Sequence, residues 1–361
     1  MFVKMSHEHL RSLLKNQEGP CISIYISKQA SLQDYDERYF EILEKVASVL
    51  SYGKDALVNT ALLTDLLRFT PSDHLKSVDE GIAIFKNRTQ GSFYICQMPI
   101  VDKFMVSQSF YLKPILEELQ GEHVFNILLL LSESAKLISC QGHSWIETNS
   151  FMLDRVDGEF FVHWKRFNEN IYYEIQKARA PLKAFLKDLD SKLKAEPEFD
   201  ERPLIVYSPL EVYSVFKRVA THPDPLFVET QGDLLKGFTE NLLPEAHTRM
   251  RSYLKDVKQK DTQEYIESSA RKMASDRLED ISSAVIKGRV KKLLLQKNSE
   301  VSGHYNRANG HVIYYDRVIE TEMADVLDDI ACDVLLRGGE VVLLEKSEMP
   351  TMNPLAAIFS S

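Results

Sequence analysis

The chain has 361 residues, of which 44% are hydrophobic and 27% are charged, and its formal net charge at pH 7 is −9. This length exceeds what one ordinary hydrophobic core serves, and the composition excludes a disordered, collagen-like or low-complexity chain. Each third of the chain is slightly acidic, which argues against a basic module that coats nucleic acid through counterion release.

The first third of the chain alternates between the apolar periods of helices and strands. This pattern predicts a first α/β domain over residues 1–121. We expect helices at 6–16, 35–50 and 56–69, and strands at 21–27, 81–87, 91–97 and 103–110.

The middle third starts with a continuous apolar run, VFNILLLLSES (124–134), which is typical of a strand buried on both faces. AKLISCQG (135–142) is its expected hairpin partner. Residues 145–175 are aromatic and charged with weak periodicity. We expect a second α/β domain with a mixed sheet over residues 122–240. Its other expected elements are helices at 181–194 and 210–220 and strands at 203–209 and 226–230.

The last third begins with a long charged helix, expected from near Pro244 to about Arg277. A strand, a helix and a second strand follow and predict a third α/β domain over residues 241–361. We expect Asp328 and Asp329 to lie on a solvated face of that helix. The only Gly-Gly pair, Gly338-Gly339, separates this helix from the last of these strands, so we expect a helix C-cap and turn rather than a reactive loop.

The four cysteines lie far apart, mostly in apolar runs, which favours buried free thiols over disulfides or a zinc site. The N-terminus carries charges throughout, and no apolar run reaches 18 residues. We therefore expect a cytoplasmic protein without a membrane span.

The order of the three units resembles the archaeal and eukaryotic class-one release factor and Pelota family, and most closely its bacterial branch. The segments that carry the resemblance are AVIKGRVKKLLLQ (284–296), DVLDDIACDVLLRGGEVVLLEKSEMP (325–350), GIAIFKN (81–87) and the PLAAIF ending. The resemblance is most specific in the last 85 residues and poorest between 145 and 240. It implies a first domain that reaches the ribosomal decoding centre and a middle domain that faces the peptidyl-transferase centre. It also implies a C-terminal domain of the kink-turn-binding ribosomal-protein type, which recruits a translational GTPase.

The chain departs from the release factors at their catalytic loop. Release factors carry a Gly-Gly-Gln loop in the middle domain, whereas the matching interval here, 145–175, holds a single glycine, Gly158. Glycine allows a backbone to enter a crowded ribosomal centre in conformations that other residues disfavour. Gly338-Gly339 is followed by Glu340 and lies in the third domain. A NIKS-like stop-codon reader is also absent from the first domain. The sequence therefore predicts no catalytic residues and no enzyme.

Two cationic segments are candidate RNA contacts on this acidic chain. HWKRFNEN (163–170) interleaves Lys165 and Arg166 with Trp164 and Phe167, and such a segment can pair phosphates and stack on bases. KNRTQG (86–91) places Lys86 and Arg88 at a hairpin tip. Both segments have a purely structural alternative, an aromatic hairpin packed on its own domain and an ordinary polar turn.

Other candidate chemistry is weak. His143 and Ser144 are neighbours on an expected strand, where adjacent side chains point to opposite faces, so they make a poor nucleophile and base. His7 and His9 have no third ligand at metal spacing, so we expect no metal site. No nucleotide-binding glycine motif occurs, and we expect no cofactor.

These patterns favour a non-catalytic ribosome-binding factor that occupies the ribosomal A site in hibernation, rescue or stress protection. Its partners would be ribosomal RNA and elongation factor Tu or a related translational GTPase. One alternative is a peptidyl-tRNA or RNA hydrolase with an unrecognised site in the middle domain. A second alternative is an adaptor that docks a GTPase without binding RNA. We further expect residues 278–361 to fold alone and to carry the GTPase-docking surface.

Overall fold

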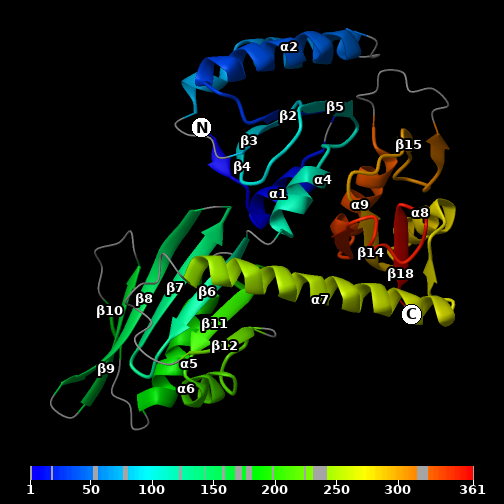
Figure 1. Ribbon diagram of the computed structural model, residues 1–361. Helices are drawn as coiled ribbons and strands as arrows, with labels where there is room; N and C mark the ends of the chain where they lie inside the picture. The colour runs from blue at the N-terminus through cyan, green and yellow to red at the C-terminus, as the bar shows by residue number, and fades with distance from the viewer. Residues whose placement is uncertain are drawn as a thin grey trace. The chain divides into compact units, whose positions relative to one another are not determined.

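The structure is a computed structural model of the chain (Figure 1). It describes all residues except 1, 18, 52–55, 76–79, 122–123, 143, 157–158, 167–172, 176–180, 197–198, 223–224, 231–241, 315–323 and 361. Only the backbone is described at residues 56, 144–156, 159–166, 173–175 and 181.

The described chain forms two compact units. The first combines residues 1–120 with residues 256–361, and the second comprises residues 121–255. Each unit contains helices and mixed sheets, so the expected mixed α/β class is confirmed. The finer division into three domains at 121 and 240 stays a prediction, as does the ribosomal-protein type of the C-terminal part.

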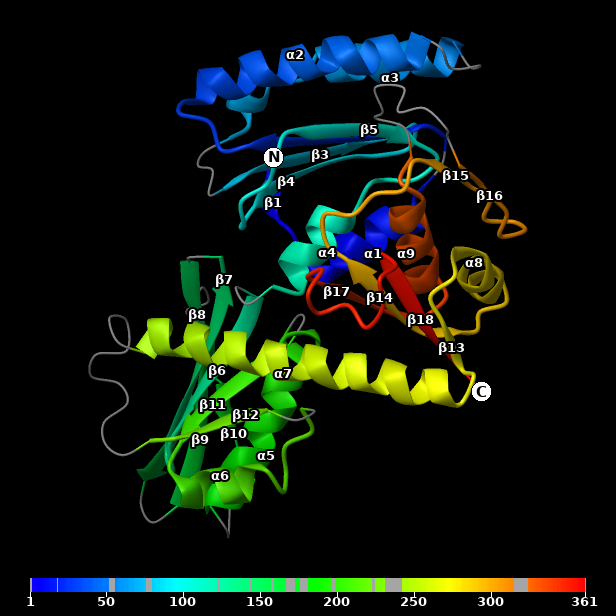
Figure 2. The same cartoon turned by 45° about the vertical axis from the view of Figure 1, so that its right-hand side comes forward.

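The N-terminal part of the first unit is a five-stranded mixed sheet covered by helices. In spatial order its strands are β1 (Val3–Lys4), β4 (Gly91–Cys96), β3 (Gly81–Lys86), β2 (Cys21–Ser27) and β5 (Lys103–Ser107). Its helices are α1 (His7–Lys15), α2 (Leu32–Ser51), α3 (Ala56–Leu67), the 3-10 turn η1 (Pro71–Asp73) and α4 (Lys113–Leu119). Apolar residues of α2 and α3, such as Ile42 and Leu62, pack on one face of the sheet against Ile24 and Ile84 (Figure 2). The alternation of apolar residues seen in the sequence thus placed these strands correctly.

The C-terminal part of the first unit is a four-stranded mixed sheet with its own helices. Its strands, in spatial order, are β13 (Ala274–Ser275), β18 (Leu355–Phe359), β14 (Val290–Gln296) and β17 (Glu340–Leu344). The helices are α8 (Leu278–Ile286) and α9 (Val326–Leu336), and β15 (Gly303–Tyr305) and β16 (Val312–Tyr314) form a separate ribbon. β14 and β17 are parallel and are joined through α9, which confirms the expected strand, helix and strand in one sheet.

One hydrophobic core joins the two parts of the first unit. It contains Tyr25 and Leu116 from the N-terminal part and Leu293 and Ile330 from the C-terminal part, all of them at most 2% exposed. Separation of the parts would return this apolar surface to water, at a cost of roughly 1.5–3 kcal/mol for each large side chain. The core therefore argues against the expectation that residues 278–361 fold alone.

The second unit is a seven-stranded mixed sheet with helices on both faces. Its strands, in spatial order, are β10 (Tyr173–Ile175), β9 (Glu159–Arg166), β8 (Ser144–Val156), β7 (Ser134–Gln141), β6 (Val124–Leu130), β11 (Leu204–Ser208) and β12 (Leu226–Glu229). The helices are α5 (Pro181–Lys194), the 3-10 turn η2 (Phe199–Glu201), α6 (Leu210–Phe216) and the first half of α7 (Leu243–Ala270). β6 is buried along its whole length, as its continuous apolar sequence predicts: Leu128 faces α5 and α6, and Leu129 faces α7.

The strands β8, β9 and β10 were not predicted from the sequence. They occupy most of the interval 145–175, whose periodicity is weak. Their backbones continue the antiparallel ladder that starts with the β6–β7 hairpin, with β8 paired to β7 and β9 paired to β8. Pairing to an existing sheet edge thus decides the structure where local preference does not.

The long helix α7 ends earlier than expected, at Ala270 rather than near Arg277. Lys272 adopts a left-handed conformation with φ of 61°. The N–H groups of Lys272 and Met273 donate to the carbonyls of Ser269 and Ser268, at 2.9 and 2.8 Å, which is a Schellman termination. The chain then enters β13, which pairs with β18, so a tertiary strand pairing ends the helix.

The glycine pair and the cysteines behave as the sequence predicts. Gly338 has φ of 83° just after α9, and the N–H of Gly339 donates to the carbonyl of Val334 at 2.9 Å. The pair is thus a helix C-cap and turn. All four cysteines are buried free thiols. Within the described residues, no helix is long and apolar enough to span a membrane.

We predict that Gly339→Ala destabilises the first unit by about 1–3 kcal/mol, because overpacking forces neighbours apart. A Cβ at this position would lie 2.6 Å from the Val290 carbonyl oxygen and 2.7 Å from Val334 Cγ1. Gly91→Ala is the matched control, since its Cβ would meet its nearest atom, Lys86 Cδ, at an ordinary 3.5 Å. Calorimetric melting measures the effect, and equal melting temperatures for both variants would contradict it.

Candidate functional site

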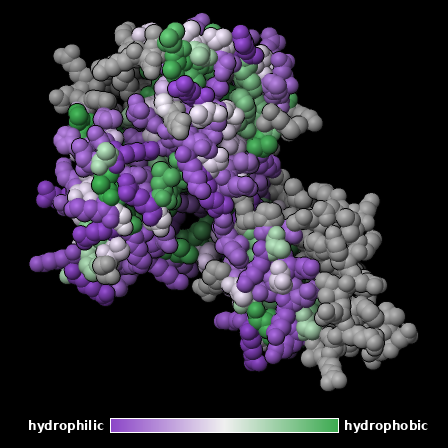
Figure 3. All heavy atoms as spheres, turned by 180° about the vertical axis from the view of Figure 1, so that it is seen from behind, coloured by the Kyte–Doolittle hydropathy of each residue, from purple (hydrophilic) through white to green (hydrophobic). Residues whose placement is uncertain are grey.

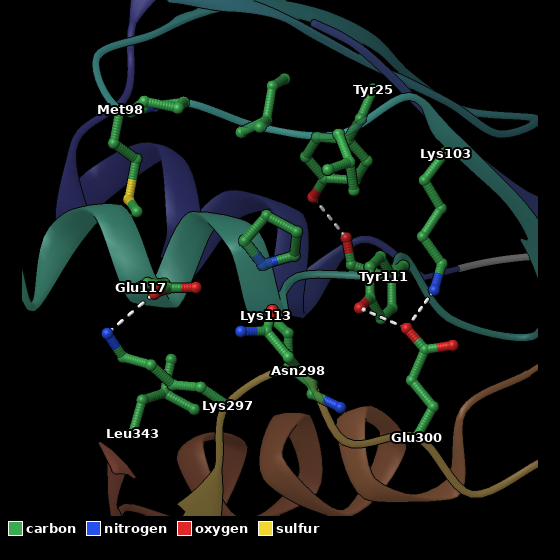
Figure 4. A pocket seen from close by; sticks show the side chains of 14 residues that line it. Tyr25, Met98, Lys103, Tyr111, Lys113, Glu117, Lys297, Asn298, Glu300 and Leu343 are labelled. Carbon is green, nitrogen blue, oxygen red and sulfur yellow. Dashed lines mark hydrogen bonds and ion pairs between the residues drawn. The ribbon is translucent and has the colours of Figure 1, made fainter. Parts of the chain in front are cut away.

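A pocket of about 170 Å³ lies in the first unit, between its N-terminal and C-terminal parts (Figure 4). One wall is the apolar segment Met98–Val101, and the opposite side is formed by residues 297–300 and Leu343. With Lys297 and Glu300 of that side included, the lining holds two tyrosines, three lysines and two glutamates. The pocket is therefore a place where charged side chains from distant parts of the sequence meet.

Lys103 and Glu300 form an ion pair at one end of the pocket. The ammonium group of Lys103 also lies over the ring of Tyr111, 4.7 Å from its centroid, and the Tyr111 hydroxyl lies 3.3 Å from the same glutamate (Figure 4). Burial opposes the charge of Glu300, but Lys103, Lys113 and this hydrogen bond outweigh it and hold the pKa of the carboxyl below its usual range. The carboxyl group of Glu300 therefore stays ionised at neutral pH.

The two other lysines of the pocket are also neutralised. Lys297 lies 2.8 Å from Glu117 and 3.1 Å from Glu345; burial disfavours its ammonium group, but these carboxylates outweigh burial and raise its pKa. Lys113 is buried and lies 2.6 Å from Asp325, and it donates a further hydrogen bond to the carbonyl of Ser299. Because each cation has its own carboxylate, the pocket offers no unpaired lysine as a nucleophile or anion ligand. Its charges join the two parts of the unit.

The helix α9 contributes four buried aspartates to the same junction, and this corrects the expected solvated face. Asp325, Asp328, Asp329 and Asp333 are all at most 6% exposed. Asp328 accepts hydrogen bonds from the backbone N–H groups of Leu112 and Lys113, at 3.0 and 2.7 Å, where α4 begins. Their spacing places them on one helix face. The N-terminal part of the unit covers Asp325, Asp328 and Asp329, whereas Asp333 accepts a hydrogen bond from Tyr305 of β15.

The predicted RNA contacts of the first unit have different surroundings. The Lys86 ammonium lies 3.0 Å from Asp65, and its side chain is only 19% exposed, so part of its charge is already used. Arg88 is exposed and has no carboxylate within ion-pair distance among the described residues. It sits in a rigid turn, because the Asn87 Oδ1 accepts from the N–H groups of Thr89 and Gln90 at 3.0 and 2.9 Å.

The predicted contacts of the second unit lie in β9 or beyond it. The backbones of Trp164, Lys165 and Arg166 pair with Phe151, Ser150 and Asn149 of β8. Phe167 lies outside the described residues, as does His143 of the weak His-Ser pair. The role of all six proposed RNA-binding residues stays a prediction, and the structure does not bring the two segments into one unit.

The N-terminal histidines lie on α1. His9 contacts the Ser6 hydroxyl at 2.9 Å and its ring lies 5.2 Å from that of Tyr94, while His7 is half-buried. In the described part of the chain no group of three or more potential metal ligands occurs.

The charged junction was missed in the sequence, although one signal was available. The four aspartates recur at helical spacing in a segment that is otherwise apolar all round, and a helix of that kind is buried. Lysines 103, 113 and 297 carry no such signal, because isolated lysines between apolar segments are usually solvated.

The comparison with protein families decides the relationship of the chain. Residues 124–289, just under half of the sequence, match the model of bacterial archaeo-eukaryotic release factor family 3. This matched segment is similar to the bacterial archaeo-eukaryotic release factors. The match includes residues 145–240, where the resemblance seen in the sequence is poorest, and only the start of the last 85 residues, where it seemed most specific.

Solved structures similar to this chain include the following three. Dom34 of S. cerevisiae, a translation termination-like factor that interacts with Hbs1, is 12% identical over 78% of this chain and 79% of its own, with a TM-score of 0.45. The archaeal translation termination factor aRF1 is 16% identical over 99% of both chains, with a TM-score of 0.25. Archaeoglobus fulgidus Pelota is 15% identical over 68% of this chain and 66% of its own, with a TM-score of 0.30.

No curated protein sequence matches this chain. Because the TM-scores lie below 0.5, the proposed function rests on the family match and on the residues of this chain.

We predict that Lys113→Met destabilises the first unit by about 3–5 kcal/mol, since it leaves Asp325 buried without its cation. Adding Asp325→Asn should recover part of the loss, because the amide oxygen can still accept the N–H groups of Val301 and Leu327. Lys28→Met is the control: its ion pair with Glu80 is exposed, and such pairs contribute under about 1 kcal/mol. Denaturant unfolding gives the values, and equal losses for Lys113→Met and Lys28→Met would show that the buried pair is unimportant.

Proposed function

We propose that this chain is a non-catalytic ribosome-binding translation factor of the release factor and Pelota type. It occupies the ribosomal A site during hibernation, rescue or stress protection and acts by occlusion. The observation that carries the proposal is a release factor match over residues 124–289 in a chain whose sequence contains no Gly-Gly-Gln.

Two features of the described residues support a factor without hydrolytic chemistry. The only Gly-Gly pair of the sequence is the C-cap of α9, where a Cβ on Gly339 would collide with Val290, so this pair serves backbone packing. The lysines of the pocket are each paired with a carboxylate, and the thiols of Cys21, Cys96, Cys140 and Cys332 have pKa values raised by burial, which suppresses their nucleophilicity.

Ribosome contact on an acidic chain needs a few concentrated cations, and the β9 segment and the β3–β4 turn are the candidates. We predict that Lys165→Glu with Arg166→Glu weakens cosedimentation with ribosomes and flattens its salt dependence. Each lost phosphate contact removes about one counterion from the slope. Arg88→Glu should act in the same direction if the first unit also contacts RNA, and it avoids placing a second carboxylate beside Asp65, as Lys86→Glu would.

The measurement is sedimentation of the full-length chain with ribosomes from growing and starved cells, at low and moderate salt. The double change Lys45→Glu with Lys287→Glu is the charge-matched control, because both lysines are exposed and lie outside the second unit. Unchanged cosedimentation of the combined Arg88, Lys165 and Arg166 variant, with an unaltered melting profile, would favour the adaptor alternative. A full-length chain that never sediments with ribosomes would contradict the proposed function itself.

We also predict that the purified chain releases no peptide from ribosomes loaded with peptidyl-tRNA, because the sequence lacks the glycines that bring a catalytic backbone into the peptidyl-transferase centre. The assay compares the chain with a release factor under the same conditions. Release at a comparable rate, abolished by substitutions in residues 155–170, would support the hydrolase alternative instead.

A translational GTPase, such as elongation factor Tu or a relative, is the proposed protein partner. Because the C-terminal part shares its core with residues 1–120, the capture experiment uses the full-length chain rather than a fragment. Capture of such a GTPase without any ribosome association would again favour the adaptor.

A further inference from the structure

The buried carboxylates of α9 exceed the cations around them. Lys113 pairs with Asp325 at 2.6 Å, and Arg307 and Arg337 approach Asp329 and Asp333 at 4.0 and 3.4 Å. Within the described residues the fourth aspartate, Asp328, has no cation of its own. Four carboxyl groups thus face three cations in a space from which water is excluded, and such an excess is relieved by binding a proton.

The partners of Asp328 come from both parts of the first unit. Its Oδ1 accepts the N–H groups of Leu112 and Lys113 in the N-terminal part, and the thiol of Cys332, one turn along α9, donates to its Oδ2 at 3.7 Å. Next to it, the Ser109 hydroxyl donates to Asp329. Residues 109–113 are therefore held on α9 through the adjacent carboxyl groups of Asp328 and Asp329, beside the ion pair of Lys113 with Asp325.

We propose that Asp328 is the proton-operated latch between the segment 109–119 and α9, closing the contact when protonated and loosening it when ionised. This device lies outside the proposed RNA contacts and does not depend on ribosome binding. It would regulate how firmly the N-terminal and C-terminal parts of the first unit hold together.

The groups that face Asp328 decide which charges change with pH. They are Asp325, Asp329 and Cys332 of α9, Lys113 of α4, Tyr111 in the segment after β5, Tyr25 of β2, and Arg307, which faces Asp329 and Cys332. Burial raises the pKa of Tyr25, Tyr111 and Cys332, so these groups stay neutral near pH 7. His304 also faces Asp329 but is not among the groups that act on Asp328. Tyr25, Tyr111 and Cys332 therefore do not account for a charge change at Asp328 near neutral pH, and its own carboxyl group does.

Burial, together with repulsion from Asp325, raises the pKa of Asp328 to about 8, and burial raises that of Asp329 to about 6. A carboxyl whose pKa is higher in the closed form than in the open form binds more protons when closed. The closed contact is then most stable below the ordinary carboxyl pKa and loses stability as the pH rises from about 4 to about 8. We assign the loss of stability of the closed contact above pH 6 to Asp328, because Asp329 titrates at the lower pH.

Hydrogen exchange of the full-length wild-type chain tests the latch between pH 6 and pH 8. The reporters are the amides of Leu112, Lys113, Leu116 and Gln120, which bond to Asp328 or within α4. After correction for the intrinsic exchange rate, we expect the protection of these amides to fall close to tenfold for each unit of rising pH. The reason is that opening of the contact releases one proton from Asp328. Amides of α5 in the second unit should keep their protection and serve as the internal control.

Asp328→Asn is the deciding variant, because its amide oxygen can still accept both N–H groups but cannot ionise. Its protection at these amides should change less than twofold over the same range. Asp256→Asn, on an exposed position of α7, should behave like the wild type. Wild-type protection that is independent of pH, or an equal slope in Asp328→Asn, would overturn the proposal. If Asp328→Asn does not fold, the wild-type profile still decides, together with Asp329→Asn, which should keep the slope above pH 6.

Discussion

The docking of α9 against the start of α4 is the constraint on which the first unit depends. It buries four carboxyl groups. Asp325 forms an ion pair with Lys113, and Asp328 accepts hydrogen bonds from the N–H groups at the start of α4. Such groups are costly to bury without partners, so the junction is stable only when its two sides meet in one geometry. The charged contacts thus specify one alignment of the two parts of the unit, whereas apolar contacts alone would tolerate several alignments.

The same junction explains why sequence neighbours and structural neighbours differ in this chain. Residues 1–120 and 256–361 form one unit, although the whole second unit is inserted between them in the sequence. The helix α7 continues from one unit into the other, and its second half is anchored in the first unit. There the buried Lys292 lies within 3.0 Å of Asp261 and Glu264, and Tyr265 packs on Leu294.

The surface is consistent with a factor that contacts RNA through few residues. In the view of Figure 3 the described surface is mostly hydrophilic, with separate small hydrophobic patches. Among the described lysines, many already serve ion pairs, including Lys86, which was proposed from the sequence as an RNA contact. On a chain of net charge −9, contact with phosphates depends on where exposed cations lie, and Arg88 is one described cation without an ion-pair partner.

The sequence by itself determined the elements that carry strong periodicity. The strands at 21–27 and 124–130, the helix at 181–194 and the cap at Gly338 follow from local apolar patterns and from glycine's access to positive φ. It also contained the resemblance that the family match confirms. Tertiary structure decided the rest: the addition of the strands β8, β9 and β10 to the sheet, the early end of α7, and the burial of Asp328 and Asp329. The burial of Asp328 depends on Leu112 and Lys113, more than 200 positions away in the sequence. A local pattern cannot report whether a helix face will meet water or another part of the chain.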